Sequence, residues 1–253
     1  MPPKSPRKRL DLVLVERGLA DSRQKAQAMI LAGEVQIDGA RADKAGQPVA
    51  QSALIEVHSR LQKYASRGGF KLEGALEDFS ISVQGKICLD VGSSNGGFTD
   101  CLLQNGAARV YAVDVNIAQL AWKLREDPRV IAIQKNARAL VPSDLPELVA
   151  LVAIDVSFIS VTKVLPAALG CAASGAHLLI LVKPQFELQR EEVSRGGIVR
   201  DPALHEKAIA TVRLAAESLA LVDLRVSPSH LPGAEGNQEY FLHAVKPPAV
   251  ESL

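Results

Sequence analysis

The residues best suited to hold a nucleotide-like ligand form a glycine turn in the first half of the chain. The apolar run 87–91 contains one acid, Asp90, and is followed by Gly92, Ser93, Ser94, Asn95, Gly96 and Gly97. The spacing of apolar residues then predicts a helix over 98–105. A strand, a glycine turn and a helix bring backbone N–H groups close to a bound nucleotide. A second acid, Asp114, ends the next apolar run and can accept both hydroxyls of a ribose.

The spacing of these glycines decides which ligand is favoured. The dinucleotide fingerprint has the pattern G-x-G-x-x-G, whereas here three residues separate Gly92 from Gly96 and the middle glycine is absent. The turn therefore disfavours NAD. Its D-x-G-x-x-x-G-G pattern resembles the first motif of S-adenosylmethionine-dependent methyltransferases, which implies S-adenosyl-L-methionine as the cofactor.

Four charged residues are expected to gather at one edge of a sheet: Lys71, Asp155, Lys183 and Glu239. Asp155 and Lys183 directly follow apolar runs, and parallel α/β sheets bind ligands beyond the carboxyl ends of their strands. Glu239 precedes the last apolar run, so it reaches this edge if its strand runs antiparallel. Lys71 lies on the predicted helix before the first strand. A single charged residue at a strand end is more often a solvated boundary residue, but four of alternating sign favour a catalytic group.

This group suits methylation of a ribose 2′-hydroxyl, which is a poor nucleophile until a base takes its proton. A lysine can act as that base only when it is neutral, and its ordinary pKa of about 10.4 makes the neutral form rare at pH 7. Desolvation and a neighbouring lysine lower such a pKa while carboxylates raise it, so the protons belong to the group as a whole. We assign Lys183 as the general base and Asp155 as the residue that orients it. Lys71 and Glu239 would position the hydroxyl.

The elements that must position these residues alternate between strands and helices. Strands are predicted at 87–91, 110–114, 130–133, 149–156, 177–183, 221–227 and 240–245. Helices are predicted at 98–105, 117–125, 161–173 and 203–219. This order predicts an α/β fold with a doubly wound, mostly parallel sheet that is covered on both faces. A loop joins the last two strands, so the final strand is expected to run antiparallel.

A smaller α+β module is predicted before this domain. Two short helices within 10–33 precede short strands at 35–37 and 54–57. Three basic residues near the helix starts lie outside the apolar faces and are candidates for phosphate contacts: Arg9, Arg23 and Lys25.

The distribution of charge favours an anionic partner for this module. Residues 1–67 carry twelve Lys and Arg against seven Asp and Glu, whereas the remainder carries seventeen against twenty-one. An ordinary solvated surface is the alternative explanation. The whole chain of 253 residues, with 47% hydrophobic and 23% charged residues, has the composition of a globular protein.

Composition argues against several other classes. Cys88, Cys101 and Cys171 form no C-x-x-C pair and the five histidines are scattered, so we expect reduced core cysteines and no metal site. Proline and glycine interrupt the uncharged run Val164–Val182, which argues against a membrane span. The first apolar run is too short for a secretory signal, and the expected location is the cytoplasm.

Five further segments carry a more specific resemblance: Tyr64–Leu72, Asp155–Ser160, Leu181–Glu187, Gly196–Pro202 and Gly236–Tyr240. They resemble the TlyA (hemolysin A) family of ribosomal RNA 2′-O-methyltransferases, which have an FtsJ-like catalytic domain. The stretch from Arg9 to Gly39 is similar to the S-four-type RNA-binding domain. The resemblance implies the class I methyltransferase fold, and the family's Lys-Asp-Lys-Glu tetrad falls on the four charged residues named above. It also implies methylation of cytidine in large-subunit RNA and, in some members, in small-subunit RNA.

The resemblance implies two further sets of site residues. Those expected to bind the cofactor are Asp90, Gly92, Ser93, Ser94, Asn95, Gly96, Gly97, Asp114, Asn136 and Asp155. Those expected to contact RNA are Arg9, Arg23, Lys25 and Arg67. Many members carry threonine in place of Asn95, which puts the contact of this residue with the methyl donor in question. For Asn136, a role as a turn residue that ends the third strand is an equal alternative.

These observations predict the following organisation: a flexible basic leader over 1–8, the RNA-binding domain over 9–59, a linker over 60–67, the methyltransferase domain over 68–247 and a tail over 248–253. The expected partner is ribosomal RNA or a ribosomal subunit, with neither membrane nor metal. Two alternatives remain at this point. One is a membrane-active, hemolysin-like protein, and the other is an RNA-binding ribosome assembly factor that transfers no methyl group.

Overall fold

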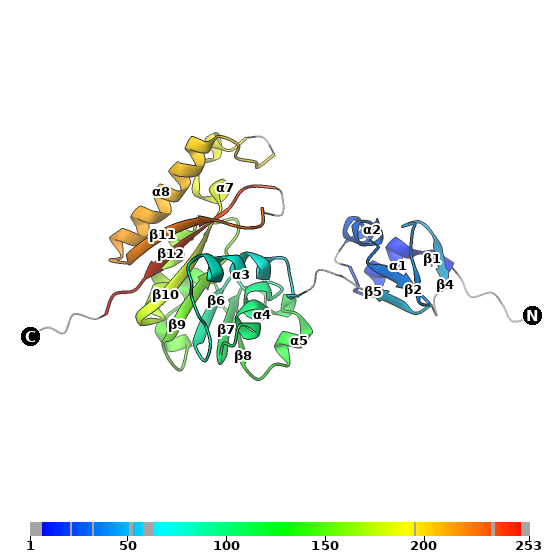
Figure 1. Cartoon of the computed structure of the whole chain (residues 1–253), viewed down its shortest axis with the longest axis horizontal. Helices are drawn as coiled ribbons and strands as arrows, with labels where there is room; N and C mark the ends of the chain where they lie inside the picture. Colours follow the sequence, from blue (N-terminus) through cyan, green and yellow to red (C-terminus); the bar gives the residue numbers. More distant parts are fainter. Residues whose placement is uncertain are drawn as a thin grey trace, which may run out of the picture. The chain divides into compact units, whose positions relative to one another are not determined.

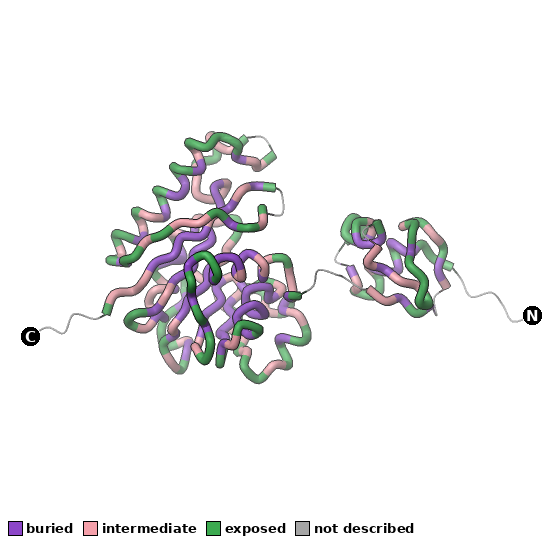
Figure 2. The backbone as a smooth tube through the Cα atoms, in the orientation of Figure 1, coloured by how far each residue is buried: buried purple, intermediate pink, exposed green. Residues whose placement is uncertain are grey.

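The computed structural model describes residues 7–20, 22–31, 33–50, 53–57, 63–194, 196–233 and 236–248. The chain divides into two compact units, Met1–Gln62 and Lys63–Leu253. Each unit has its own hydrophobic core, and Figure 2 shows buried residues concentrated inside each one.

The first unit packs two helices against short strands. Helix α1 (Leu10–Glu16) and helix α2 (Arg23–Leu31) enclose a core that includes Leu14 and Ile30. Ser22 caps α2, because its hydroxyl accepts a hydrogen bond from the Lys25 N–H at 3.2 Å. The strands are β1 (Arg7–Arg9), β2 (Val35–Ile37), β3 (Ala40–Arg41), β4 (Pro48–Ala50) and β5 (Ile55–Val57). They form a sheet of order β3-β2-β5 and a separate pair, β1-β4.

Two of the expected segment limits differ from the structure. The flexible leader was expected to extend through residue 8, but Arg7 and Lys8 lie in β1 and pair with Ala50 and Val49 of β4. Backbone pairing with β4 fixes them. Residues 1–6 of that leader, residues 60–62 of the expected linker and residues 249–253 of the expected tail lie outside the described residues.

The remainder of the expected linker belongs to the second unit. Tyr64 is 1% exposed and packs edge-on against Phe70, with 5.2 Å between ring centroids. The Ala65 N–H donates to the Asp100 carboxylate at 2.7 Å. A large buried ring and a bond to a buried acid hold residues 63–67 against the helices of this unit.

The second unit is built on a seven-stranded sheet of order β11-β12-β10-β9-β6-β7-β8 (Figure 1). The strands are β6 (Ile87–Val91), β7 (Arg109–Asp114), β8 (Val130–Gln134), β9 (Val149–Ile154), β10 (Ala172–Val182), β11 (Val222–Pro228) and β12 (Tyr240–Val245). The strands β8, β7, β6, β9 and β10 pair in parallel, and β12 runs antiparallel to β10 and β11, as predicted.

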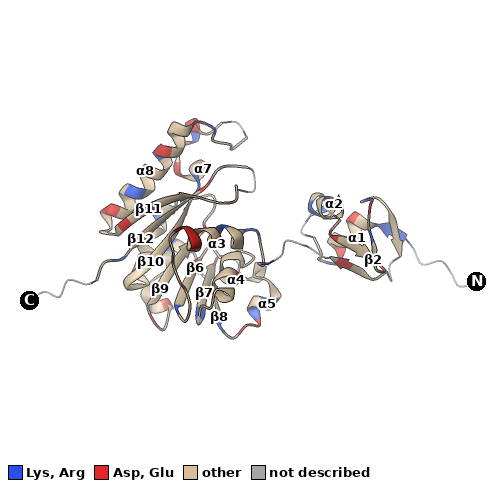
Figure 3. Cartoon of the chain, viewed as in Figure 1, with Lys and Arg blue, Asp and Glu red and all other residues tan. Residues whose placement is uncertain are grey.

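Successive residues of a strand point to opposite faces of the sheet. The strands of this sheet are apolar on both faces, and helices cover both of them. Leu151 and Leu179 join one core with α3 (Gly68–Asp78), α4 (Gly97–Gln104) and α5 (Trp122–Arg125). Val152 and Ile180 join the opposite core with α6 (Leu165–Gly170) and α8 (Pro202–Ser218). Figure 3 shows charged residues of both signs along α8.

Three predicted elements are divided or extended in the structure. The segment 117–125 is split into a 3₁₀ turn and α5, because Leu120 between them has an extended backbone. The segment 161–173 is split into a 3₁₀ turn and α6, with Pro166 in the first turn of α6, where a missing N–H is tolerated. Strand β10 begins five residues earlier than predicted, because an irregularity between Ala172 and His177 accommodates Gly175, which has a φ of +73°.

Candidate active site

The glycine turn follows β6 and lies over the ends of the neighbouring strands. Gly92 has a φ of +88°, and a Cβ atom at this position would lie 2.1 Å from the Asp155 carbonyl oxygen. The N–H groups of Gly92 and Ser93 both donate to the Val113 carbonyl, at 2.8 and 3.1 Å. The turn is therefore held on β7 and passes over β9 so closely that position 92 admits only glycine.

The second half of the turn packs against helices. Gly96 has a φ of +91°, and a Cβ atom there would lie 2.2 Å from a Leu124 methyl of α5. A Cβ atom on Gly97 would lie 2.2 Å from the Ser66 hydroxyl and 3.0 Å from the Gly69 nitrogen. The beginning of α3 therefore packs directly on the beginning of α4. This contact brings α3, which carries Lys71, close to the glycine turn.

Asp114 holds the turn from the end of β7. Its Oδ2 accepts a hydrogen bond from the Ser94 N–H at 2.9 Å, and its Oδ1 accepts one from the Asn116 N–H at 2.9 Å. Asn95 contacts Ser94, with 3.2 Å between the Ser94 hydroxyl and the Asn95 Oδ1. Asn136 follows β8 and accepts from the Arg138 N–H at 3.0 Å, which is the contact expected of a turn residue.

Two buried polar atoms beneath the turn have no hydrogen-bond partner among the described residues: Asp90 Oδ1 and Ser93 Oγ. The Asp90 carboxyl is fully buried, and its other oxygen accepts from the Thr99 hydroxyl at 2.6 Å. Burial raises the pKa of Asp90 to about 7, and the nearby Asp155 adds to the rise. These unpaired atoms, together with the close backbone approach at Gly92, fit a polar, nucleotide-like group held at the turn.

The four charged residues form two ion pairs at the carboxyl edge of the sheet. Lys71 Nζ lies 2.5 Å from Glu239 Oε2, and Lys183 Nζ lies 2.5 Å from Asp155 Oδ1. Three of the four side chains are buried, and the Asp155 side chain is 23% exposed. Lys183 also donates to the Ser157 hydroxyl at 2.9 Å. Sequence reasoning did not assign a role to Ser157, although it lies inside one of the quoted motifs.

Strand register brings the two pairs together. Val182 of β10 is paired with Tyr240 of β12, and the strands are antiparallel. Lys183 follows Val182 and Glu239 precedes Tyr240, so these two residues leave the sheet at adjacent positions. Asp155 follows β9, which is the other neighbour of β10. Because β12 runs antiparallel, Glu239 lies at the same edge of the sheet as the other three charged residues.

An aromatic pair lies beside Lys183 and was not predicted. Phe158 has a φ of +64° and is 93% exposed, and its ring centroid is 5.4 Å from that of Phe186. Lys183 Nζ lies 5.9 Å from the Phe186 ring centroid. Gln185 Oε1 is buried and has no partner among the described residues. A nearly fully exposed ring in a strained backbone conformation next to a catalytic candidate is typical of a binding surface.

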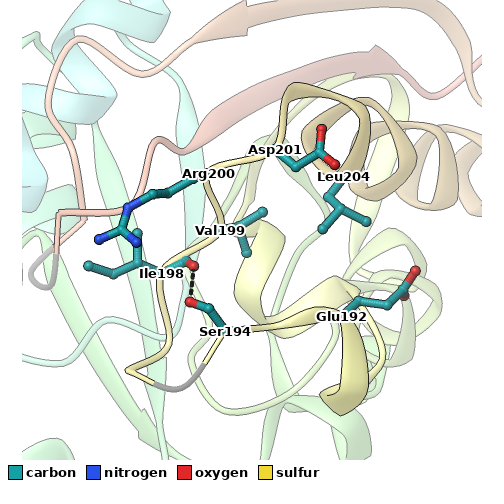
Figure 4. A pocket seen from close by; sticks show the side chains of 7 residues that line it. All are labelled: Glu192, Ser194, Ile198, Val199, Arg200, Asp201 and Leu204. Atoms are coloured by element: carbon teal, nitrogen blue, oxygen red, sulfur yellow. Dashed lines mark hydrogen bonds between the residues drawn. The ribbon is translucent and has the colours of Figure 1, made fainter.

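The structure also records a pocket on the loop before α8. It is lined by Glu192, Ser194, Ile198, Val199, Arg200, Asp201 and Leu204 (Figure 4). None of the site residues expected from the sequence lines this pocket.

The basic residues expected to contact RNA lie in both units. In the first unit, Asp11 is fully buried and accepts from Arg9 at 2.9 and 3.0 Å, from Arg23 at 3.0 Å and from Gln27 at 3.0 Å. The hydrogen bonds from Arg9 hold the pKa of Asp11 well below its usual range. Lys25 is exposed on α2.

In the second unit, Arg67 is exposed at the start of α3.

Within the described residues, no group of three or more His, Cys, Asp or Glu is placed to hold a metal ion. None of the described helices combines the length and the apolar character that a membrane crossing needs.

The fold and the glycine turn define the class of protein. An S-adenosylmethionine-dependent methyltransferase from Mesorhizobium loti has a similar structure, with a TM-score of 0.51 over 69% of this chain and 97% of that chain at 14% identity. At that identity the likeness shows the fold alone. The second unit therefore has the Rossmann-like methyltransferase fold.

The family follows from closer matches. The model of the FtsJ-like methyltransferase family matches residues 64–246, and that of the S4 domain matches residues 8–55. The chain belongs to the FtsJ-like methyltransferase family and, within it, to the TlyA (hemolysin A) family, with an S4 domain in front.

Two relatives show how close the match is. The 16S/23S rRNA (cytidine-2′-O)-methyltransferase TlyA of Mycobacterium tuberculosis is 49% identical over 238 residues, which is 93% of this chain and 89% of that protein. The structure of a putative hemolysin from Streptococcus thermophilus has a TM-score of 0.76 at 41% identity, over 96% of this chain and 89% of that chain.

Proposed function

We propose that this chain methylates the ribose 2′-hydroxyl of a cytidine in ribosomal RNA, with S-adenosyl-L-methionine as the methyl donor. Large-subunit RNA is the first expected acceptor and small-subunit RNA the second. The observation that supports the proposal is the position of two ion pairs at the sheet edge beside the glycine turn. The substrate class comes from the relative named above, whose printed activity is cytidine-2′-O methylation of 16S and 23S rRNA.

The glycine turn and its neighbours would hold the donor. Backbone groups of the turn, the Asp90 and Asp114 carboxylates and the unpaired Ser93 hydroxyl are the polar groups available to it. Asn136 and Asp155, at the ends of β8 and β9, complete the proposed set. When bound, S-adenosylmethionine supplies an electrophilic methyl group on a positively charged sulfur.

Lys183 would take the proton from the ribose 2′-hydroxyl. The Asp155 carboxylate and the Ser157 hydroxyl both contact its ammonium group, so Lys183 Nζ is held in a fixed position. Lys71 of α3 and Glu239, which directly precedes β12, form the other ion pair and would orient the hydroxyl. Alignment of the reacting groups can supply about 7–11 kcal/mol of the barrier reduction.

The aromatic pair of exposed Phe158 and half-buried Phe186 would receive the acceptor base. A cytidine whose ribose reaches Lys183 must leave the base stack of a folded RNA, and such a base is commonly stacked on aromatic side chains. Phe158, with its 93% exposed ring beside Phe186, offers that surface. In the S4 domain, Arg9 and Arg23 would contact phosphates and Lys25 would add positive charge. Arg67, at the start of α3 in the second unit, would add positive charge there.

The test is transfer of a radiolabelled methyl group to isolated 30S and 50S subunits, followed by mapping of the modified ribose. Replacing Lys183 by methionine is expected to lower the transfer rate by about 10²- to 10⁴-fold, the usual contribution of a positioned general base. Binding of S-adenosylmethionine, measured by calorimetry, should remain within a factor of about two, because the lysine is expected to act on the acceptor hydroxyl. The matched control is Lys207→Met, which removes a lysine that is paired with Glu192 on the surface.

The outcomes separate the alternatives. A Lys183→Met variant with wild-type transfer would contradict the base assignment. A wild-type protein that binds RNA but neither S-adenosylmethionine nor its demethylated product would be an assembly factor. Release of dye from liposomes without any methyl transfer would instead identify a membrane-active protein.

A further inference from the structure

We propose that Asn237 is a positioning residue that fixes the Glu239 carboxylate against Lys71. This inference rests on the proposed function, because it concerns the same four charged residues. The loop that carries Glu239, residues 229–233 and 236–239 of the described chain, contains no helix or strand. Its buried acid must nevertheless be placed accurately, since it shares an ion pair with a residue of α3.

The side chain of Asn237 ties this loop to the segment 197–199. Asn237 is 1% exposed. Its Oδ1 accepts from the Val199 N–H at 2.8 Å, and its Nδ2 donates to the Gly197 carbonyl at 2.8 Å. The two ends of the amide face a donor and an acceptor, so only one orientation satisfies both. Removing the side chain would leave a buried N–H unpaired, which costs about 1–3 kcal/mol.

The other flank of Glu239 is tied to the same segment. His205 of α8 lies 2.9 Å from the Val199 carbonyl through Nε2 and 3.0 Å from the Tyr240 hydroxyl through Nδ1. A carbonyl only accepts, so Nε2 carries the proton and donates to Val199. A neutral imidazole then accepts from Tyr240 at Nδ1. Asn237, two residues before Glu239, is therefore bonded directly to Val199. Tyr240, one residue after Glu239, is linked to Val199 through His205.

The carboxylate itself has little room to move. A Cβ atom on Gly233 would lie 2.5 Å from Glu239 Oε1, so the backbone of Gly233 packs against that oxygen. The Gly233 N–H donates to the Asn237 carbonyl at 2.8 Å, which keeps the loop closed over the carboxylate. The other oxygen, Oε2, faces Lys71. The side chain of Asn237 ties this loop to the segment 197–199, so its removal would release Glu239 from that side. The backbone bond between Asn237 and Gly233 would remain.

The segment 197–199 continues into the pocket described above. Figure 4 shows Arg200 on the opposite side of this loop from Asp201 and Glu192. The pocket shares Val199 with the contacts that Asn237 and His205 make to this segment. Loss of these contacts would therefore change the position of Glu239. It would not change the glycine turn, which lies between β6 and α4.

The experiment compares Asn237→Ala and Asn237→Asp with the wild-type full chain. The measurements are kcat and KM for the ribosomal subunit, the dissociation constant of S-adenosylmethionine and the midpoint of thermal unfolding. Displacement of a catalytic group by about 1 Å can cost about 100-fold in rate, so Asn237→Ala should lower kcat by about that factor. KM and the donor dissociation constant should stay within a factor of about two, because neither binding surface contains Asn237.

Asn237→Asp is the conservative variant. It keeps the acceptor for the Val199 N–H but puts an oxygen in place of the donor to the Gly197 carbonyl, so its kcat should lie below that of the wild type. The matched control is Asn105→Ala, which removes an amide that donates to the Cys101 carbonyl at the end of α4. This control should retain the wild-type kcat.

The result is decisive in each case. A kcat loss of about tenfold or more with unchanged donor binding supports the positioning role. A kcat closer to that of the wild type, or a loss of donor binding as large as the loss in kcat, overturns it. If Asn237→Ala does not fold, the same limits are applied to Asn237→Asp. A wild-type protein without methyl transfer would instead refute the proposed function, and the inference would fall with it.

Discussion

Replacing Asp90 by asparagine is expected to stabilise the free protein at pH 8 and to weaken its binding of S-adenosylmethionine. Asp90 is fully buried under the glycine turn, and burial raises its pKa from 3.8 to about 7. The hydroxyl of Thr99 donates to one of its oxygens, and the other has no partner among the described residues. An ionised Asp90 is therefore poorly solvated in the free protein. The asparagine amide does not ionise and keeps an acceptor for Thr99.

The direction and size of the effect follow from proton linkage. A carboxyl that binds its proton more tightly in the folded chain than in the unfolded chain favours folding at low pH. Its contribution is fully present below the unfolded pKa, falls as the pH rises, and stops falling at the folded pKa, here about 7. Each pKa unit corresponds to about 1.4 kcal/mol, so wild-type stability loses about 3 kcal/mol through Asp90 between pH 5 and pH 8. Asp90→Asn does not lose this stability between pH 5 and pH 8, because asparagine does not ionise.

The assay is chemical unfolding of wild type and Asp90→Asn at pH 5 and pH 8, followed by far-ultraviolet circular dichroism, with calorimetric titration of S-adenosylmethionine at pH 8. The unfolding free energy of the variant relative to wild type should increase by about 3 kcal/mol from the lower to the higher pH. Donor affinity should fall because the variant lacks one carboxylate of the proposed donor site. The matched control is Asp114→Asn. The carboxylate of Asp114 lies at the partly exposed end of β7.

Two results would refute the reasoning. A stability difference that is the same at both pH values would show that ionisation of Asp90 carries no burial cost. Unchanged donor affinity in Asp90→Asn would remove this residue from the donor site. Asp114→Asn should weaken donor binding.

Two further substitutions address the RNA side. Phe158→Leu should raise the KM for the ribosomal subunit, because stacking of a base on an aromatic side chain contributes about 1–3 kcal/mol. Donor affinity and thermal stability should not change, because the ring of Phe158 is 93% exposed. An unaltered KM would remove this residue from the acceptor site. Asp11→Asn should weaken RNA binding, measured by fluorescence anisotropy, even though it raises the net positive charge, because Asp11 holds the guanidinium groups of Arg9 and Arg23 in place. Tighter binding would show that these arginines act only as charges.

The periodic parts of the fold were predictable from the sequence. The short apolar runs 87–91 and 149–156 were predicted as buried strands, and the structure has strands at Ile87–Val91 and Val149–Ile154. The missing helix before β12 correctly predicted its antiparallel direction. Proline and glycine shifted the limits, as in the division at Pro166 and the early start of β10 near Gly175. These shifts depend on local backbone geometry, which periodicity does not encode.

The contacts of the site were less predictable than its members. The strand ends indicated that Lys71, Asp155, Lys183 and Glu239 could converge, but not that Lys71 pairs with Glu239. That pairing depends on the packing of α3 on α4, which Gly97 permits. Ser157 and Phe158, which sequence reasoning missed, lie on an irregular loop. Phe186 lies in a helix of only four residues, Pro184–Glu187. In neither segment does a period of two or of 3.6 identify the inward face.

Asp155 connects the two halves of the site through different atoms. Its carbonyl oxygen lies where any side chain at Gly92 would have to go, at 2.1 Å from the Cβ position. Its carboxylate is paired with Lys183. The end of β9 is thus in contact with the donor turn through its backbone and with the proposed base through its side chain. A larger residue at position 92 would push on this strand end and would disturb Lys183 as well as the turn. Glycine is required at position 92 because a Cβ atom there would strike the Asp155 carbonyl, and not only because φ is positive. In the proposed site, Asp155 therefore belongs to both the donor half and the acceptor half.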